Sequence, residues 1–543
     1  MAGRVTTVGV LSPRCLDRAR PARGRPNVPG VNDAPASYAA RKIPGSALGW
    51  CATITRGVPQ PEVLLGDRVE TSPDTFFEGV WDGPFAERGF LQSAAVMGSG
   101  GRVDGEFTRF CAPSHTLDLL YCLRAADQVV VANSLPLLFA RVGDGPDPRY
   151  RHYVRDIAAL WRGGLPASPL VLPTRRHQTV LAYAATDLVV GPDLSVAAVA
   201  KPHPPAPTAY ADYYQTLSGA VDRIIANGTD PMRRTPLHPL TTLSSGYDSA
   251  AVSVLGAHAG VTEAVTLQHG RFDDTGAEVA AVLDLQLTMI DRESWRQLEQ
   301  PVEVEFMASN GGPSALTFAA LEGRWRAPMV LLGTLGDQTW SLGHALMGAE
   351  LSIPDGLSLT QAGLHDFRLR SGITFVHVPA IGVVHATAIA RISESDEMGP
   401  WRLGTSYDRP VPRRIIEDAG IPRAAFATEK RAGAAVNPDK ALRPPARADF
   451  ERYWRSLLRE LPLGTRWRYR FGAEVVTPSV RLARIVLYRL RTKWFRFTET
   501  RRALGRRYFY RSLPSAYRFH WAVERLTDEF AASLAAEDDN PRD

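Results

Sequence analysis

Short apolar runs separated by turn residues dominate the chain from about residue 47 to residue 205. The clearest runs cover residues 94–98, 128–133, 170–172, 180–183 and 188–190. Turn signals such as Gly143-Asp144-Gly145 separate the runs, a spacing typical of strands joined by turns. We therefore predict a β-rich domain over residues 47–205, followed by a proline-stiffened linker at 201–207.

The pattern changes after about residue 206, where helical periodicity alternates with short apolar runs. Residues 210–226 and 275–287 have helical spacing, and the runs at 238–243, 262–268, 287–290 and 330–332 are typical of strands. This alternation indicates βαβ units around a parallel sheet. We therefore predict an α/β domain over residues 206–455, with its ligand site at the carboxyl ends of the strands.

One motif follows the strand expected at 238–243 and leads into a helix expected at 250–256. It reads Leu243-Ser244-Ser245-Gly246-Tyr247-Asp248-Ser249. A turn of this kind presents unpaired backbone N–H groups and the positive end of the helix dipole, which together bind phosphate. Asp248 adds a carboxylate suited to Mg²⁺. The structural alternative is an ordinary N-capped helix, in which Asp and Ser are turn residues.

The motif resembles the PP-loop of the asparagine-synthetase-like ATP pyrophosphatases, whose usual form is Ser-Gly-Gly-x-Asp-Ser. Ser245 stands where that family has its first glycine. The resemblance covers roughly residues 205–445, and residues 47–205 only in outline. It implies a Rossmann-like parallel sheet of the PP-loop (HUP) type, preceded by a degenerate amidotransferase domain with a β-rich, Ntn-like α+β fold. It also implies that ATP binds at Leu243, Ser244, Gly246, Asp248 and Ser249.

A second loop follows the strand at 330–332 and resembles the family's Ser-Gly-Glu-Gly-Ala-Asp-Glu loop. Gly333 and Asp337 match that pattern, whereas Thr334, Leu335 and Gln338 depart from it. The resemblance implies that Gly333 contacts ATP and that Asp248 and Asp337 hold Mg²⁺ as pyrophosphate leaves. A simple strand-to-helix turn is the alternative.

Leu267 and Gln268 end the strand at 262–268, which occupies the place of the family's adenosine-binding strand. The resemblance implies that their backbone groups contact adenine. The acidic residues that follow at 273–278 are equally typical of a helix N-terminus, where the dipole favours Asp and Glu.

Glu397 and Lys430 look like the acid and lysine positions of the related β-lactam synthetases. On that resemblance, Glu397 helps to deprotonate an attacking amine, and Lys430 stabilises charge that develops during acyl transfer. The stretch 407–414 lies between them and resembles a recurring stretch of the family. The alternative for both residues is a solvated surface position.

The residues near the N-terminus argue against glutamine hydrolysis. Members of the family that hydrolyse glutamine have a nucleophilic cysteine directly after the initiator methionine, whereas this chain has Ala2, and its nearest cysteine is Cys15. The nitrogen donor is therefore expected to be ammonia or an amine. The four cysteines form no CxxC pair, so neither a disulfide framework nor a zinc site is expected.

Composition and charge are ordinary for a globular protein, with 45% hydrophobic and 22% charged residues and a formal net charge of +6. No apolar run reaches the roughly 20 residues that span a bilayer, and we predict a cytoplasmic protein. Residues 1–46 are interpreted as a poorly ordered leader without a secretory signal. Residues 456–543 form a basic, aromatic helical tail. Its segment 466–511 suits an anionic membrane surface, nucleic acid or packing on the catalytic domain; of these, nucleic acid is not expected.

Together these features predict an ATP-dependent amide-forming ligase. It would activate a small-molecule or peptide carboxylate as an acyl-adenylate, release pyrophosphate and transfer the acyl group to an amine or ammonia, using ATP and Mg²⁺. The alternative is a catalytically degenerate homologue that binds a nucleotide or has a regulatory role. In either case, a role at the inner face of the membrane in envelope or natural-product biosynthesis is a further hypothesis.

Overall fold

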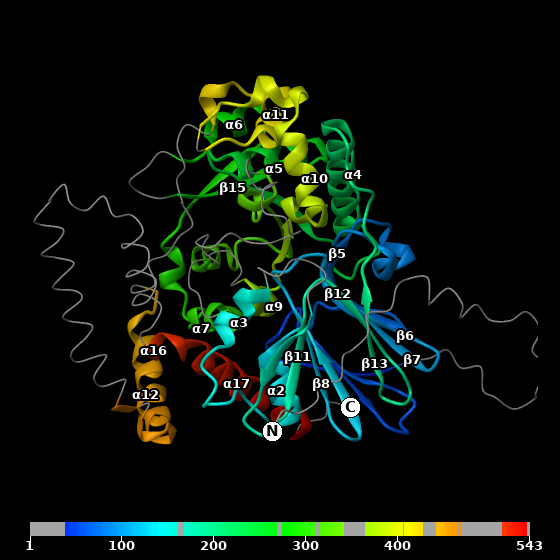
Figure 1. Ribbon diagram of the computed structural model, residues 1–543, viewed down its shortest axis with the longest axis vertical. Coiled ribbons are helices and arrows are strands. Elements are labelled where there is room, and N and C mark those ends of the chain that lie inside the picture. The colour runs from blue at the N-terminus through cyan, green and yellow to red at the C-terminus, as the bar shows by residue number, and fades with distance from the viewer. Residues whose placement is uncertain are drawn as a thin grey trace, which may run out of the picture.

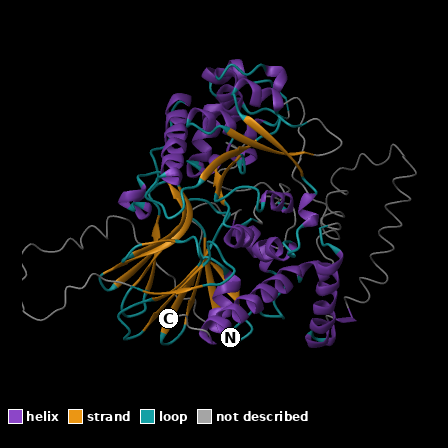
Figure 2. Ribbon diagram, turned by 180° about the vertical axis from the view of Figure 1, so that it is seen from behind, coloured by secondary structure: helices purple, strands orange, loops and turns teal. Residues whose placement is uncertain are grey.

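A computed structural model describes residues 38–160, 168–268, 274–310, 315–340, 364–405, 407–426, 441–464, 466–467 and 513–539. Its strands gather in two regions, a fan of mostly antiparallel strands and a smaller parallel sheet flanked by helices (Figure 1, Figure 2). The chain is therefore mixed α/β, with a β-rich N-terminal region followed by a region built on a parallel sheet.

Two sheets pack face to face in the N-terminal region. Among the described residues, one has seven strands in the order β1-β3-β2-β9-β8-β11-β10, and the other has six in the order β13-β12-β7-β6-β5-β4. The strands are β1 (Ala39–Lys42), β2 (Trp50–Thr55), β3 (Glu62–Leu65), β4 (Glu70–Thr71), β5 (Thr75–Trp81), β6 (Val96–Asp104), β7 (Phe107–Cys111), β8 (Leu120–Arg124), β9 (Gln128–Ala132), β10 (Leu170–Pro173), β11 (Thr179–Tyr183), β12 (Thr186–Val190) and β13 (Val196–Ala200). The strands predicted from the apolar runs are confirmed as β6, β9, β10, β11 and β12.

Period-two alternation in these strands fills two separate cores. In β9, Val129 and Val131 lie in the core between the two sheets. Val130 and Ala132 face the other way, into a core shared with α2 (Leu135–Val142) and with helices of the C-terminal region. Successive side chains of a strand point to opposite faces, so one sheet packs against both the second sheet and a helical layer.

The C-terminal region is built on five strands, as far as the described residues show: β14 (His238–Thr242), β15 (Glu263–Gln268), β16 (Gln286–Asp291), β17 (Pro328–Leu332) and β18 (Thr374–His377). Their order is β16-β15-β14-β17-β18, and every neighbouring pair is parallel. In β17, Met329 and Leu331 face one core while Val330 and Leu332 face the other. Both faces are buried, which explains the continuous apolar runs in the sequence.

Helices cover both faces of the parallel sheet. One face of the sheet shares a hydrophobic core with five helices: α4 (Tyr210–Thr229), α5 (Tyr247–His258), α6 (Ala277–Val282), α10 (Ala386–Glu394) and α11 (Pro410–Asp418) (Figure 1). The other face packs toward α7 (Glu303–Asn310) and α9 (His365–Ser371). The predicted helix at 210–226 is confirmed as α4. The helix predicted at 275–287 is shorter, because Asp284 takes a positive φ of 52° and ends it.

The strand order of the parallel sheet reverses at its centre. From β14 the chain moves outward to β15 and β16, and it then returns to the opposite side of β14 with β17. The loops that follow β14 and β17 therefore leave neighbouring strands at the same edge. Open parallel sheets bind their ligands at such a reversal point.

The C-terminal segment returns to the N-terminal region. α17 (Arg518–Asp539) follows α16 (Leu513–Ala516) and packs on α7 and α2, with His520 and Trp521 buried. The tail is thus helical and packed on the protein over residues 513–539. Most of the basic segment 466–511 lies outside the described residues.

Two predicted boundaries need correction. β1 lies within the range predicted as a leader, and Ile43 after it is buried. Its sequence Ala-Ala-Arg-Lys shows no apolar alternation because β1 is a largely exposed edge strand. α12 (Pro444–Glu460) crosses the predicted boundary at residue 455, since Trp454 and Leu457 on one face of a single helix are both buried. Residues 1–37 lie outside the described residues.

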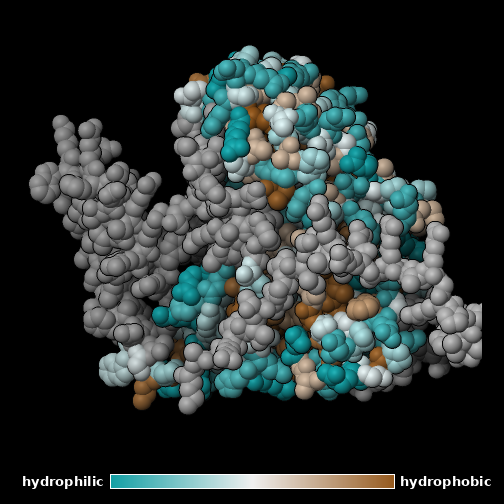
Figure 3. Space-filling view, turned by 45° about the vertical axis from the view of Figure 1, so that its right-hand side comes forward, coloured by the Kyte–Doolittle hydropathy of each residue, from teal (hydrophilic) through white to brown (hydrophobic). Residues whose placement is uncertain are grey.

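The helices of the described part of the chain include none that is both long and apolar enough to cross a membrane. On the face seen in Figure 3, hydrophilic residues cover most of the described surface at the top of the molecule, where α11 and α5 lie in Figure 1.

Candidate functional site

The loop after β14 is held in shape by its own serines. The Ser249 hydroxyl accepts a hydrogen bond from the Ser244 backbone N–H at 3.1 Å, and the two hydroxyl oxygens lie 2.7 Å apart. The Gly246 N–H donates to the Ser244 Oγ at 3.2 Å. α5 begins directly after Gly246, with Asp248 in its first turn. The predicted strand, turn and helix N-terminus are therefore all present.

A third segment lies against this loop. Gly276 has a φ of +69°, and a Cβ added there would lie 2.8 Å from the Leu243 Cγ and 2.9 Å from the Ser244 carbonyl oxygen. Just before it, the Asp274 carboxylate accepts hydrogen bonds from the Ser245 N–H at 3.1 Å and from the Ser245 hydroxyl. An anion of the chain itself is thus bound at the turn where the sequence predicts phosphate.

The loop after β17 touches the loop after β14 through two glycines. A Cβ at Gly333 would lie 2.8 Å from the Asp248 backbone carbon, and a Cβ at Gly336 would overlap the Asp248 carboxyl group. Only glycine lets the two loops approach this closely.

Leu335 has a left-handed backbone conformation, with a φ of +75°. The resembling family has glycine at this position, and left-handed backbone is the conformation that favours glycine. Leu335 is 6% exposed, so the strain of its backbone is offset by burial of its side chain.

Asp248 and Asp337 converge on one cation, the guanidinium of Arg409. Arg409 pairs with Asp248 through Nη1 and with Asp337 through Nη2. The Arg409 side chain is 3% exposed, whereas the side chains of Asp248 and Asp337 are 23% and 37% exposed. The Nε of Arg409 is buried and has no hydrogen-bond partner among the described residues.

The donor set at this point fits a nucleotide-bound Mg²⁺. Mg²⁺ usually takes one or two carboxylates and completes its octahedron with phosphate oxygens and water, and Asp248 and Asp337 supply two carboxylates aimed at one position. Within the described ranges, no group of three or more His, Cys, Asp or Glu residues gathers to hold a metal without such help.

Arg409 belongs to a segment clamped on α5. Tyr407 packs on the Tyr247 ring at 5.0 Å between centroids, and the Arg413 guanidinium donates to the Tyr247 hydroxyl. Burial, followed by the nearby Asp248 carboxylate, raises the pKa of Tyr407. The sequence singled out the stretch 407–414 but not Arg409. The available signal was an arginine in the stretch that resembles the family, since two acidic loops at one sheet edge need a counter-charge.

Leu267 and Gln268 end β15, the strand next to β14. The Gln268 carbonyl accepts from the Arg292 N–H at 3.3 Å, and the Leu243 N–H donates to the Val265 carbonyl at 2.8 Å. The ends of β15 and β14 therefore lie side by side. This places both residues at the same sheet edge as the two loops.

Glu397 has other partners. Its carboxylate accepts from Arg414 at 2.8 Å and from the Tyr210 N–H, at the start of α4, at 3.4 Å. Its side chain is 42% exposed, and no described contact joins it to Asp248 or Asp337. Lys430, the other residue that the sequence nominates for catalysis, lies outside the described residues.

A second polar cluster lies between the two regions. Arg368 on α9 donates to both oxygens of Glu78 on β5, at 2.6 and 3.0 Å, and its Nε donates to Asp118 at 2.8 Å. His365 pairs with the other Asp118 oxygen at 2.9 Å. Burial opposes ionisation of Asp118, but Arg368 and then His365 hold its pKa well below the usual value.

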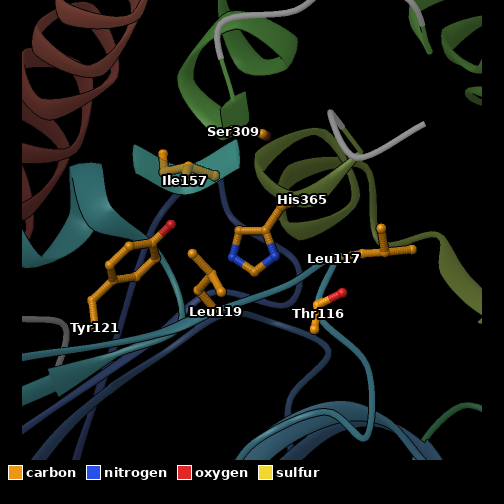
Figure 4. A pocket seen from close by; sticks show the side chains of 7 residues that line it. All are labelled: Thr116, Leu117, Leu119, Tyr121, Ile157, Ser309 and His365. Atoms are coloured by element: carbon orange, nitrogen blue, oxygen red, sulfur yellow. The ribbon is translucent and has the colours of Figure 1, made fainter. Parts of the chain in front are cut away.

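A small cavity adjoins this cluster (Figure 4). Figure 4 shows His365 at its centre, with Leu119 and Tyr121 on one side and Ile157 and Ser309 on the other. The cavity offers room for about one water molecule, too little for a nucleotide or another substrate of that size. The buried cluster is therefore structural.

No family model matches the chain, and no curated protein matches it. The functional argument therefore rests on the loops at the edge of the parallel sheet.

Proposed function

We propose that the chain is an ATP-dependent amide-forming ligase of the asparagine-synthetase-like class. The observation that carries the proposal is the convergence of Asp248 and Asp337, from loops that follow adjacent strands, on one cation position beside the α5 N-terminus. In this proposal, the parallel sheet is a Rossmann-like PP-loop domain, because its order β16-β15-β14-β17-β18 is the doubly wound order. The β-rich region is a degenerate amidotransferase domain.

Each loop has a defined task in the proposed reaction. The α5 N-terminus, with Ser244, Gly246 and Ser249, binds the phosphates, and the backbone at Leu267 and Gln268 binds adenine. Asp248 and Asp337, approached by Gly333, hold the Mg²⁺, which neutralises phosphate charge when bound.

The chemistry takes two steps. A substrate carboxylate attacks the α-phosphate, the bond to the β-phosphate breaks, and pyrophosphate leaves. The acyl-adenylate then reacts with an amine or ammonia, which forms the amide and releases AMP. On the resemblance, Glu397 takes the proton of the amine and Lys430 stabilises the transition state. The contacts of Glu397 with Arg414 and with the start of α4 favour a structural role for Glu397.

A second candidate is a nucleotide-binding homologue without turnover. The specific observation in its favour is that Arg409 fills the position between the two carboxylates. Thr334, which stands in place of the family's loop glutamate, points the same way. A pure binder would bind ATP but would not exchange pyrophosphate into it. Cytoplasmic location, or association with an anionic membrane surface through residues 466–511, is proposed with either candidate.

The decisive experiment is ATP–pyrophosphate exchange with a panel of carboxylic acids. The ligase proposal predicts exchange with at least one acid, and Asp248→Ala should lower it by about 100-fold or more, since removal of even a supporting metal-site partner costs 10–100-fold. Asp291→Ala is the matched control, because Asp291 ends β16 in the same sheet and its side chain accepts from the Glu293 N–H. ATP binding without exchange would support the second candidate, and the absence of both would refute the first.

A further inference from the structure

Two internal contacts lie at the proposed nucleotide site. The Asp274 carboxylate lies on the Ser245 N–H and hydroxyl, and the Arg409 guanidinium lies between Asp248 and Asp337. The first is a negative charge where the loop would bind phosphate. The second is a positive charge where the acids would bind a divalent cation. The chain thus supplies both charges that a metal–triphosphate ligand carries.

We propose that Asp274 and Arg409 are internal substitutes for phosphate and cation, so that the site opens only to a nucleoside triphosphate that already carries its divalent cation. This inference rests on the proposed function, because it concerns how the same site is loaded. It assigns to Arg409 and Asp274 a role in selecting the metal-bound nucleoside triphosphate over the free nucleotide or the free cation.

A free divalent cation meets an unfavourable exchange. To bind between Asp248 and Asp337 it must displace the guanidinium of Arg409, whose side chain is 3% exposed. A displaced guanidinium that stays buried without a counter-charge is strongly destabilised. A divalent cation that binds alone brings no anion with which the displaced guanidinium could pair.

A triphosphate without metal meets the opposite problem. Asp248, Asp274 and Asp337 all lie around the two loops, and like charges at such short range repel. The metal-bound triphosphate resolves both problems at once. Its metal takes the two carboxylates, and its phosphate oxygens accept hydrogen bonds from the freed guanidinium, whose Nε has no partner among the described residues.

The exchange of Asp274 for phosphate requires little rearrangement of the loop. The backbone N–H of Ser245 and the N-terminus of α5 stabilise either anion. Gly276 lets the Asp274 segment lie directly on the loop, so the segment has to withdraw when the phosphate binds. Phosphate and metal binding are therefore coupled through two separate chain segments.

The test measures binding of Mn²⁺, as a paramagnetic stand-in for Mg²⁺, and binding of ATP in EDTA, each to the full chain. In the wild type both bind weakly alone, and each strengthens the other by about 10-fold or more, within the usual range of coupling between sites. Arg409→Met should bind Mn²⁺ alone at least about 10-fold more tightly, because the guanidinium no longer competes with the metal for Asp248 and Asp337. Asp274→Asn should bind ATP in EDTA about 5-fold more tightly.

Two controls make the result specific. Arg423→Met removes an arginine that pairs with Glu417 outside the loops, and its Mn²⁺ affinity should equal that of the wild type. Adding Asp248→Asn to Arg409→Met should abolish the gain. If Arg409→Met does not fold, Arg409→Lys retains the charge with a shorter reach and should show a smaller gain.

The outcomes separate this inference from the proposed function. A folded Arg409→Met protein with wild-type Mn²⁺ affinity overturns the inference, even if ATP–pyrophosphate exchange occurs. Tighter Mn²⁺ binding in Arg409→Met supports the inference that Arg409 and a metal compete for this site. It does so even if no carboxylic acid supports ATP–pyrophosphate exchange, the reaction that tests the proposed function.

Discussion

Two arginines in this protein each bridge two carboxylates, but in different surroundings. Arg368 joins Glu78 and Asp118 between the two regions, and its partners are 0% and 7% exposed. Arg409 joins Asp248 and Asp337 at the edge of the parallel sheet, and its partners are 23% and 37% exposed. The guanidinium itself is about equally buried in both clusters, at 4% and 3% exposed.

The exposure of the acids indicates what each cluster can do. Solvent and ions do not reach Glu78, so the Arg368 cluster is fixed once the chain folds. A ligand can reach Asp248 and Asp337 from solvent, so the Arg409 cluster can exchange its cation. An arginine between two carboxylates therefore stabilises the fold in the Arg368 cluster and forms a candidate binding site in the Arg409 cluster.

The largest expected effect is a difference in the free energy of unfolding that is lost when each arginine is replaced. Arg368→Met leaves the buried Glu78 carboxylate without its counter-charge and Asp118 with His365 alone, and should lower the free energy of unfolding by about 3–5 kcal/mol. Arg409→Met leaves partly exposed carboxylates and should cost about 1 kcal/mol or less. Urea denaturation of both variants measures the difference. Equal losses would contradict the distinction between the buried Arg368 cluster and the partly exposed Arg409 cluster.

The next effect concerns how the stability of the protein depends on pH through His115, a buried histidine near the Arg368 cluster. His115 is 1% exposed, its ring packs on that of His377 at 4.9 Å between centroids, and the charges of Asp118 and Arg368 act on it. Burial lowers the pKa of His115 to about 4, Asp118 opposes the shift, and Arg368 adds to it. The unfolded chain takes up a proton near pH 6.5, which the folded protein refuses until about pH 4. The contribution of His115 is therefore fully present above pH 6.5 and declines as the pH falls toward 4, by roughly 3 kcal/mol in total.

The matching experiment is urea denaturation at several pH values between 7 and 4. The wild type should lose stability over this range more steeply than His115→Gln, because glutamine takes up no proton. Parallel slopes in the two proteins would show that His115 is not held neutral in the folded state.

A smaller effect is expected at the contact between the two loops. Gly336→Ala would place a methyl group on the Asp248 carboxyl group, so it should cost roughly 1–3 kcal/mol and weaken metal–nucleotide binding. Gly89→Ala is the control, because nothing lies within 4 Å of a Cβ added at Gly89. If Gly336→Ala binds Mg·ATP as the wild type does, the close approach of the loops has no functional role.

The sequence predicted four of the five described strands of the parallel sheet and five of the thirteen described strands of the N-terminal region. The parallel sheet was the easier part, because continuous apolar runs such as 330–332 mark strands buried on both faces. The sequence paired Asp248 and Asp337 only through a resemblance of their two loops to a known family, whereas the fold shows that these loops follow neighbouring strands. It did not identify β1, whose exposed residues carry no hydrophobic period, or the continuation of α12 past residue 455. Arg409 was also missed, because its partners lie 161 and 72 residues away in sequence (409 − 248 and 409 − 337) and only the fold brings them together.

Leu335 shows a different limit of sequence reasoning. It stands where the resembling loop has glycine, and its backbone has a φ of +75°, the left-handed conformation that favours glycine. The cost of left-handed backbone is about 1–2 kcal/mol, comparable to the gain from burying a leucine side chain. A motif compares residue types only, whereas the fold balances two energies of similar size.

Equilibrium binding of Mg²⁺ with a non-hydrolysable ATP analogue tests the central claim most directly. The account predicts that the wild type and Asp291→Ala bind the complex equally, and that Asp248→Ala and Asp337→Ala each lose about 10-fold or more in affinity. Equal affinity in all four proteins would contradict a metal–nucleotide site between the loops that follow β14 and β17.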